Sequence, residues 1–175
     1  KKISKSDPEM RRLMDQLILT NLLSNHSGEM LRFFVLSTHY RRPIEFSDEE
    51  LAAKKKGLDT FYRLFDRIQR VTGHDPYAGG PGVDAAAPET TSESVRAFVK
   101  ECLEHRDRFI EAMDDDFNTG GATGVMFDLA TAINRFIDTE RLESGGKPET
   151  GRTAMQAVQT LRALGGVLGL FEKRP

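Results

Sequence analysis

Apolar residues recur at helical spacing along almost the whole chain, and no segment alternates polar and apolar residues as a strand does. Residues 47–72 are typical. Ser47–Glu50 matches a capping box, and large apolar side chains then follow at intervals of three, four or seven residues. Such a pattern predicts an all-α fold. We expect an antiparallel helical bundle over residues 47–175, preceded by a short helical lead-in.

Further helices are expected on both sides of residues 47–72. One begins at Ser6 and carries its apolar face over residues 10–18; the others span about 27–40, 92–113, 119–142 and 153–168. In the 92–113 helix, Ile110 is assigned to the core stripe. Gly145–Pro148 is expected to break the chain between the last two helices.

Two regions follow from this division. Residues 1–46 form a terminal loop with connecting helices, and residues 47–175 form the bundle. The bundle includes a segment at about 73–91 that is rich in Gly, Pro and Ala. Because a long structureless stretch is unusual inside a compact domain, we expect this segment to be a mobile loop.

The composition indicates an ordinary soluble protein with a cytoplasmic location. The net charge of −2 argues against strong non-specific binding to nucleic acid, although a local basic patch remains open. The one cysteine, Cys102, cannot form an intrachain disulfide, and no apolar run is long enough to span a membrane. Because the first residue is Lys1 rather than Met, we expect a processed chain or part of a longer one.

The first residues contain a compact phosphate-binding composition. Lysine ammonium groups neutralise phosphate charge, and serine hydroxyls with backbone N–H groups complete such a cradle. The candidate ATP-binding residues are Lys2, Ile3, Ser4, Lys5 and Ser6. Of these, Lys5 is the candidate catalytic residue, because a mobile lysine can stabilise charge that develops during nucleotidyl transfer. A solvated, lysine-rich terminus is the alternative.

Several blocks resemble one enzyme family. Residues 2–6 resemble the K-M-S-K-S signature of class I aminoacyl-tRNA synthetases, with Ile3 in place of Met. Residues 29–47 resemble the segment that follows this signature in cysteinyl-tRNA synthetases. Residues 112–119, followed by 127–129 and 133–134, and residues 161–171 are similar to the helical domain of the same family. The blocks occur in the family's order over most of the chain.

The resemblance implies a ligase that activates cysteine with ATP and magnesium and then transfers it to the tRNA for cysteine. Lys5 would contact ATP, with Lys2 and Ser4 in supporting positions, and the bundle would pack on the anticodon stem. The partners implied are tRNA, ATP and cysteine. The catalytic zinc of the family would belong to a domain absent from this chain. The chain by itself is therefore expected to lack aminoacylation activity.

This sequence also departs from the family pattern. Asp7–Glu9 replaces the usual Leu-Gly-Asn after the signature, and no His-Ile-Gly-His element is present. One cysteine and four scattered histidines do not make a tetrahedral zinc site, so no metal site is expected in these residues.

A row of basic residues is the candidate tRNA-binding surface. Residues at intervals of seven, four and three lie along one side of a helix, and two more arginines precede it. The predicted phosphate track consists of Arg41, Arg42, Lys56, Arg63, Arg67 and Arg70. An ordinary solvated helix face is the alternative.

Two other functions fit parts of the sequence. One is a related ligase that joins cysteine to a sugar amine, although a full tRNA-binding helical region argues against it. The other is a helical interaction module without catalysis. An upstream domain with a His-Ile-Gly-His element would distinguish a synthetase from that module.

Overall fold

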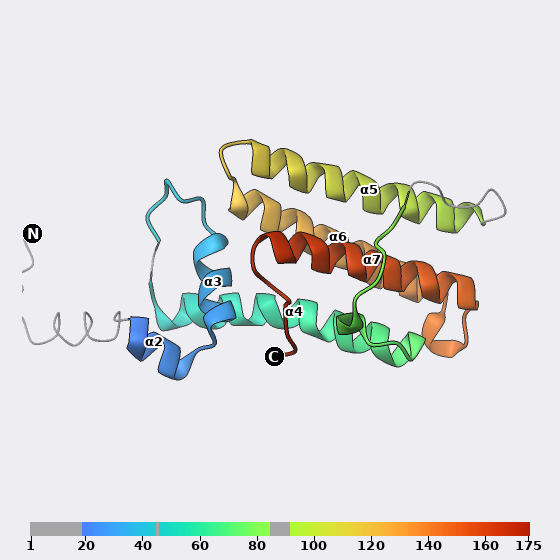
Figure 1. The fold of residues 1–175 in the computed structure, drawn as a ribbon, viewed down its shortest axis with the longest axis horizontal. Helices are drawn as coiled ribbons and strands as arrows, with labels where there is room; N and C mark the ends of the chain where they lie inside the picture. The colour runs from blue at the N-terminus through green and yellow to red at the C-terminus, as the bar shows by residue number, and fades with distance from the viewer. Residues whose placement is uncertain (1–18, 45, 85–91) are drawn as a thin grey trace, which may run out of the picture.

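The computed structural model describes residues 19–44, 46–84 and 92–175, and every regular element in these ranges is a helix (Figure 1). The α-helices are α2 (Leu19–Asn25), α3 (Gly28–Leu36), α4 (Asp48–Thr72), α5 (Glu93–Asp114), α6 (Thr119–Thr139) and α7 (Pro148–Val167). Two 3₁₀ turns, η1 (Pro76–Ala78) and η2 (Leu142–Ser144), lie between them. The all-α prediction is confirmed. The helix expected from Ser6 lies outside the described residues.

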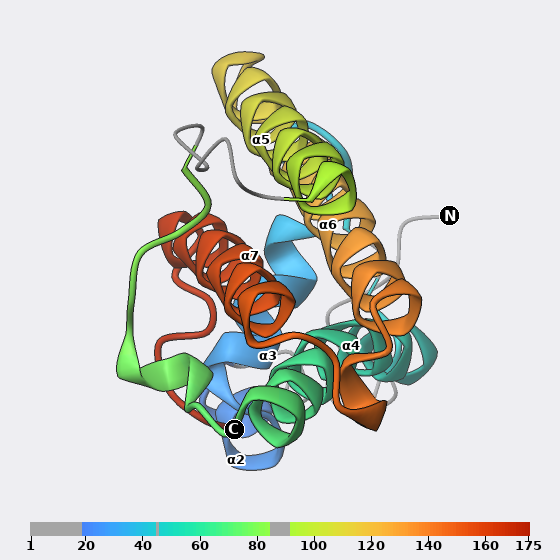
Figure 2. The same ribbon diagram turned by 90° about the vertical axis from the view of Figure 1, so that its right-hand side faces the viewer.

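The four long helices alternate in direction and form a layered bundle. Viewed end-on, α5 lies at one side, α4 lies at the other, and α6 and α7 lie between them (Figure 2). The short helix α3 packs against α4 and α6. Its buried side chains, among them Phe33 and Phe34, join the same hydrophobic core as the bundle. No helix in the described ranges has the length and hydrophobicity needed to cross a bilayer.

Side-chain caps explain where most of the helices start. The Ser27 hydroxyl accepts a hydrogen bond from the Met30 N–H at 3.2 Å, and Ser47 caps α4 through the Glu50 N–H at 3.1 Å. Asn118 caps α6 by accepting from the Gly121 N–H at 2.9 Å. Each cap satisfies an N–H that has no partner within the helix. At the other end of α4, Gly73 adopts a left-handed φ of 71° that ends the helix.

The boundaries around residue 145 differ from those predicted. Helix α7 begins at Pro148, five residues before the expected start, because proline at the first turn has a helical φ and needs no N–H partner. Helix α6 ends at Thr139 rather than at 142. Arg141 then turns the chain with a φ of 51°, and Leu142–Ser144 forms η2.

The first part of the predicted mobile loop is packed against α7. Pro76 and Val83 are buried, and the Val83 N–H donates to Oγ1 of Thr160 at 2.9 Å. Nε2 of Gln159 also donates to the Pro76 carbonyl at 2.8 Å. Residues 73–84 are therefore fixed across the bundle, while residues 85–91 lie outside the described part of the chain.

The core is rich in aromatic side chains. Phe61, Phe65 and Phe171 are almost fully buried, and the rings of Phe65 and Phe171 meet edge to face with centroids 5.1 Å apart. The prediction for Ile110 is wrong, since this side chain is 47% exposed. Ile110 follows the buried Phe109, so it lies about 100° further round the helix, outside the core stripe.

Candidate nucleic-acid interface

Helix α4 brings most of the predicted phosphate track onto one surface. Lys56, Arg63 and Arg70 are exposed. Arg63, Arg67 and Arg70 line a hollow of about 460 Å³ together with Asp66 of the same helix and Asn134 of α6. Within the described residues, Lys56, Arg63 and Arg70 form no ion pair. Their charge is therefore available to a ligand.

Arg67 differs from its neighbours because its guanidinium is already engaged. It bonds Oε1 of Glu143 at 3.0 Å and Oδ1 of Asn134 at 2.7 Å, and it forms an ion pair with Asp138. Its side chain is only 17% exposed. The hydrogen bond to Glu143 is the main cause of its raised pKa, followed on the raising side by Asp138. Arg67 thus joins α4 to α6 and η2 and is poorly placed to hold a phosphate.

Arg41 and Arg42 lie in the turn after α3, near the opposite end of α4 from Arg70. The Arg41 guanidinium forms an ion pair with Asp116 at 2.9 Å and lies over the Tyr40 ring, 5.5 Å from its centroid. The Tyr40 hydroxyl donates to the same aspartate at 2.8 Å. Arg42 is exposed and has no ion pair within the described residues. Only Arg42 of this pair therefore offers an uncompensated charge.

The ion pairs of the bundle are concentrated on α5 and α6. Arg135 pairs with Glu101, Arg108 pairs with Asp128, and Lys100 pairs with Glu104. The α4 side carries the unpaired cations instead. The α4 side is therefore the candidate surface for a polyanion, even though the whole chain is slightly acidic.

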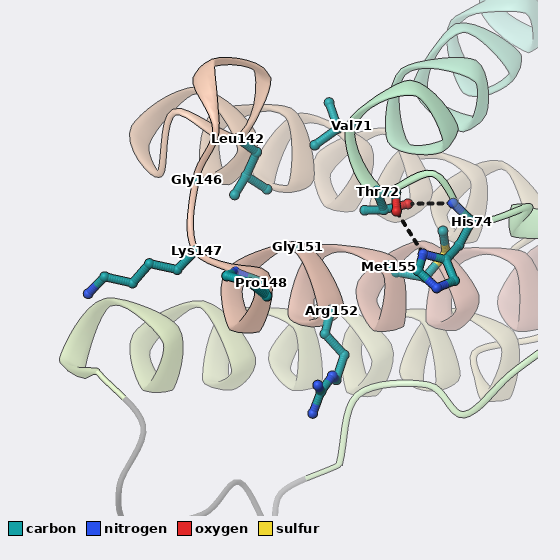
Figure 3. Close-up of a pocket in the computed structure, with 10 residues that line it drawn as sticks. All are labelled: Val71, Thr72, His74, Leu142, Gly146, Lys147, Pro148, Gly151, Arg152 and Met155. Atoms are coloured by element: carbon teal, nitrogen blue, oxygen red, sulfur yellow. Dashed lines mark hydrogen bonds between the residues drawn. The ribbon is translucent and has the colours of Figure 1, made fainter.

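A second hollow lies where the end of α4, η2 and the start of α7 meet (Figure 3). Its volume is about 450 Å³. Val71, Leu142 and Met155 supply apolar surface, while Lys147 and Arg152 supply positive charge. Sequence reasoning missed this site because its walls come from segments about 70 residues apart in the chain. The one local signal is Lys147-Pro148, where a predicted helix break is in fact a helix start.

Other side chains that could act as a nucleophile or bind a metal have structural roles instead. Cys102 is fully buried in the core, and burial raises the pKa of its thiol to about 12. Asn118 serves as a helix cap, and Asp116 pairs with Arg41. Among the described residues, no group of three or more His, Cys, Asp or Glu side chains is close enough to hold a metal ion. Lys2–Ser6 lie outside the described residues, so their ATP-binding role stays a prediction.

Comparisons with known proteins agree on one enzyme. Residues 108–172 match the family model of the DALR domain. The chain is 35% identical over 174 residues to the cysteine–tRNA ligase of Halalkalibacterium halodurans, which covers 98% of the chain and 33% of that protein. It is 37% identical over 163 residues to the cysteine–tRNA ligase of Pelobacter propionicus, covering 90% of the chain and 30% of that protein. The chain therefore spans about a third of the length of these curated relatives.

Proposed function

Because this chain is a homologue of the cysteine–tRNA ligases over almost all of its length, we propose that it is the tRNA-binding part of such a ligase. The complete enzyme joins cysteine to its tRNA at the expense of ATP, in the cytoplasm. In this proposal, the bundle holds the tRNA while a separate catalytic domain activates cysteine.

The row of unpaired cations on α4 is the observation that carries the tRNA-binding role. Lys56, Arg63 and Arg70 are spaced by seven residues, which places successive charges about 10 Å apart along the helix. A rod of regularly spaced cations suits a phosphate backbone, because such contacts need position and charge but no base recognition. Arg67 supports this track by fixing the helix against α6 and η2.

The ATP-binding role rests on the resemblance of Lys2–Ser6 alone. Lys5 would neutralise charge on the ATP phosphates, with magnesium bound to the same nucleotide. The zinc of the family would be held by residues of the catalytic domain, outside this chain. Titration of the complete ligase and its Lys5→Ala variant with ATP and cysteine would test the first of these assignments.

Charge reversal on α4 tests the proposed tRNA surface. Binding of the tRNA for cysteine to the chain is measured over a series of salt concentrations, with Arg63→Glu and the double variant Arg63→Glu/Arg70→Glu. Each lost phosphate contact should reduce the salt slope by about 0.7–0.9. Binding by the double variant at physiological salt should fall by at least about tenfold, because repulsion replaces attraction.

A charge reversal on α5 is the matched control. Arg106 is 44% exposed and pairs only with the adjacent Asp107, so Arg106→Glu changes the net charge as much as Arg63→Glu does, on a helix away from the α4 row. This variant should bind tRNA like the unmodified chain. If Arg63→Glu and Arg106→Glu lost tRNA affinity equally, net charge alone would explain the loss. If the α4 variants bound tRNA normally, the row would not be part of the interface. A chain that binds no tRNA at all would contradict the proposed function.

A further inference from the structure

The hollow between α4, η2 and α7 combines an apolar wall with a cationic rim. Val71, Leu142 and Met155 face a space of about 450 Å³, within the roughly 300–1,000 Å³ range of small-ligand sites. Lys147 and Arg152 extend from the rim toward solvent (Figure 3). Such a space suits a ligand with an apolar or aromatic body and an attached anion.

No acidic side chain lines this hollow, so the rim charge is uncompensated. Neither Lys147 nor Arg152 forms an ion pair with a described residue. Glu149 is outside the lining, but it precedes Arg152 by three residues and so lies on the same side of α7 as Arg152. Glu143 of the adjacent η2 turn is already bonded to Arg67. An anion at the Lys147 end of the rim therefore meets a cation, and no carboxylate is in the lining.

His74 supplies a fixed polar group at the edge of the hollow. Its Nδ1 lies 2.7 Å from the Thr72 carbonyl oxygen, and a carbonyl can only accept, so this nitrogen carries the proton. Nε2 of the ring remains for a ligand. The backbone N–H of His74 donates to Oγ1 of Thr72 at 3.2 Å, which further fixes the ring (Figure 3).

The missing side chain of Gly151 leaves this space open. A Cβ atom built on Gly151 would meet only Cγ2 of Thr72, at an ordinary contact distance of 3.8 Å. A larger side chain there would extend into the hollow without a backbone clash. The position therefore allows the hollow to be filled without a change of charge.

We propose that this hollow holds one unpaired nucleotide of a bound RNA, with the base against the apolar wall and the phosphate at the cationic rim. This inference rests on the proposed tRNA-binding function. The α4 cation row leads to the site, because Arg70 directly precedes Val71 of the wall. The Arg67–Glu143 bond holds η2, which carries Leu142, against the same helix.

Two variants of opposite kind test the pocket in the full chain. Gly151→Leu fills the hollow and should weaken binding of the tRNA for cysteine at least about fivefold, because the base can no longer bury its apolar surface there, with an unchanged salt slope. Lys147→Gln/Arg152→Gln removes the rim charge and should reduce the slope by about 1–2. Gly166→Leu is the matched control, since it adds the same side chain to the same helix where no atom lies within 4 Å.

Thermal unfolding shows whether each variant is folded before its affinity is compared. Folded Gly151→Leu that binds tRNA as tightly as Gly166→Leu would overturn the proposal. If Arg63→Glu/Arg70→Glu still loses tRNA binding in that case, the tRNA-binding function is supported and only the proposal for the hollow is contradicted. If the unmodified chain binds no tRNA, the proposed function falls first.

Binding of cytidine or adenosine monophosphate alone shows whether the hollow is a site for free nucleotides or for a nucleotide within RNA. Weak binding of a monophosphate that Gly151→Leu abolishes, together with weakened tRNA binding, supports the proposal. Tight monophosphate binding with tRNA binding unaffected by Gly151→Leu would identify a free-nucleotide site instead and contradict it. Binding of an acidic peptide, but of neither RNA nor nucleotide, would also contradict it.

Discussion

Phe171 is held in a conformation that its side chain does not favour. Its φ is 63°, in the left-handed region that bulky residues rarely adopt, yet the ring is almost fully buried. Its N–H donates to a carboxylate oxygen of Glu29 at 2.6 Å, and its carbonyl accepts from Arg162 at 3.0 Å. These two bonds, with burial of the ring against Phe61 and Phe65, offset the strain of the backbone.

The position of this ring depends on the absence of a side chain at Gly165. A Cβ atom there would lie 2.3 Å from Cδ2 of Phe171, so the ring would have to move. Alanine favours a helix over glycine by about 1 kcal/mol, but overpacking a core costs about 1–3 kcal/mol. We expect Gly165→Ala to lower the free energy of unfolding in urea. Gly166→Ala, its exposed neighbour, should be neutral or stabilising; equal values for both would contradict the packing argument.

At the scale of elements, Arg67 is the side chain that fixes α4 to α6 and η2. We expect Arg67→Ala to reduce the free energy of unfolding by about 1–3 kcal/mol, because hydrogen bonds to charged groups are lost and Oδ1 of Asn134 loses its donor. Arg63→Ala, one helical turn away on the exposed surface, should change it by less than about 0.5 kcal/mol. Urea unfolding followed by circular dichroism measures both. If Arg67→Ala did not lower the free energy of unfolding, the structural role would be contradicted, and Arg67 would again be a candidate for the phosphate track.

The sequence could not distinguish these two arginines. Both fall on the same predicted stripe, and the partners of Arg67 lie 67 to 76 residues further along the chain. Helix starts were predictable where the signal is local, as at Ser27, Ser47 and Asn118. The sequence is ambiguous at Pro148, because a proline can either end a helix or occupy its first turn. Here it starts α7. The hollow beside α7 depends on tertiary contacts, and Lys147-Pro148 is its one local signal.

At the scale of the whole molecule, ion-paired charges and unpaired cations lie on different sides. Paired charges cover α5 and α6, where they contribute little energy each because they are exposed to solvent. Unpaired cations remain on α4 and at the start of α7. This distribution favours one orientation of a bound polyanion, with α4 toward the nucleic acid and α5 away from it. The proposed RNA binding therefore needs only one face of a slightly acidic protein.

The stability of the whole fold should fall at alkaline pH, because its buried acids resist ionisation. Burial raises the pKa of the Cys102 thiol from 9.0 to about 12, and burial first, then the bond to Glu29, raises the pKa of Tyr62. A raised pKa in the folded state contributes stability that is complete below the unfolded pKa. That contribution is lost as the pH rises above it, since only the unfolded chain releases the proton.

The Cys102→Ala variant shows how much of this loss of stability at alkaline pH comes from the thiol. Between pH 8 and pH 10, the free energy of unfolding of the unmodified chain should fall by about 1.4 kcal/mol more than that of Cys102→Ala, because one proton is released on unfolding. The alanine variant loses stability at every pH through its cavity, so only the difference between the two pH values is compared. Urea unfolding in reducing buffer provides both values. Parallel profiles for the two proteins would show that the thiol ionises as readily in the folded core as in the unfolded chain.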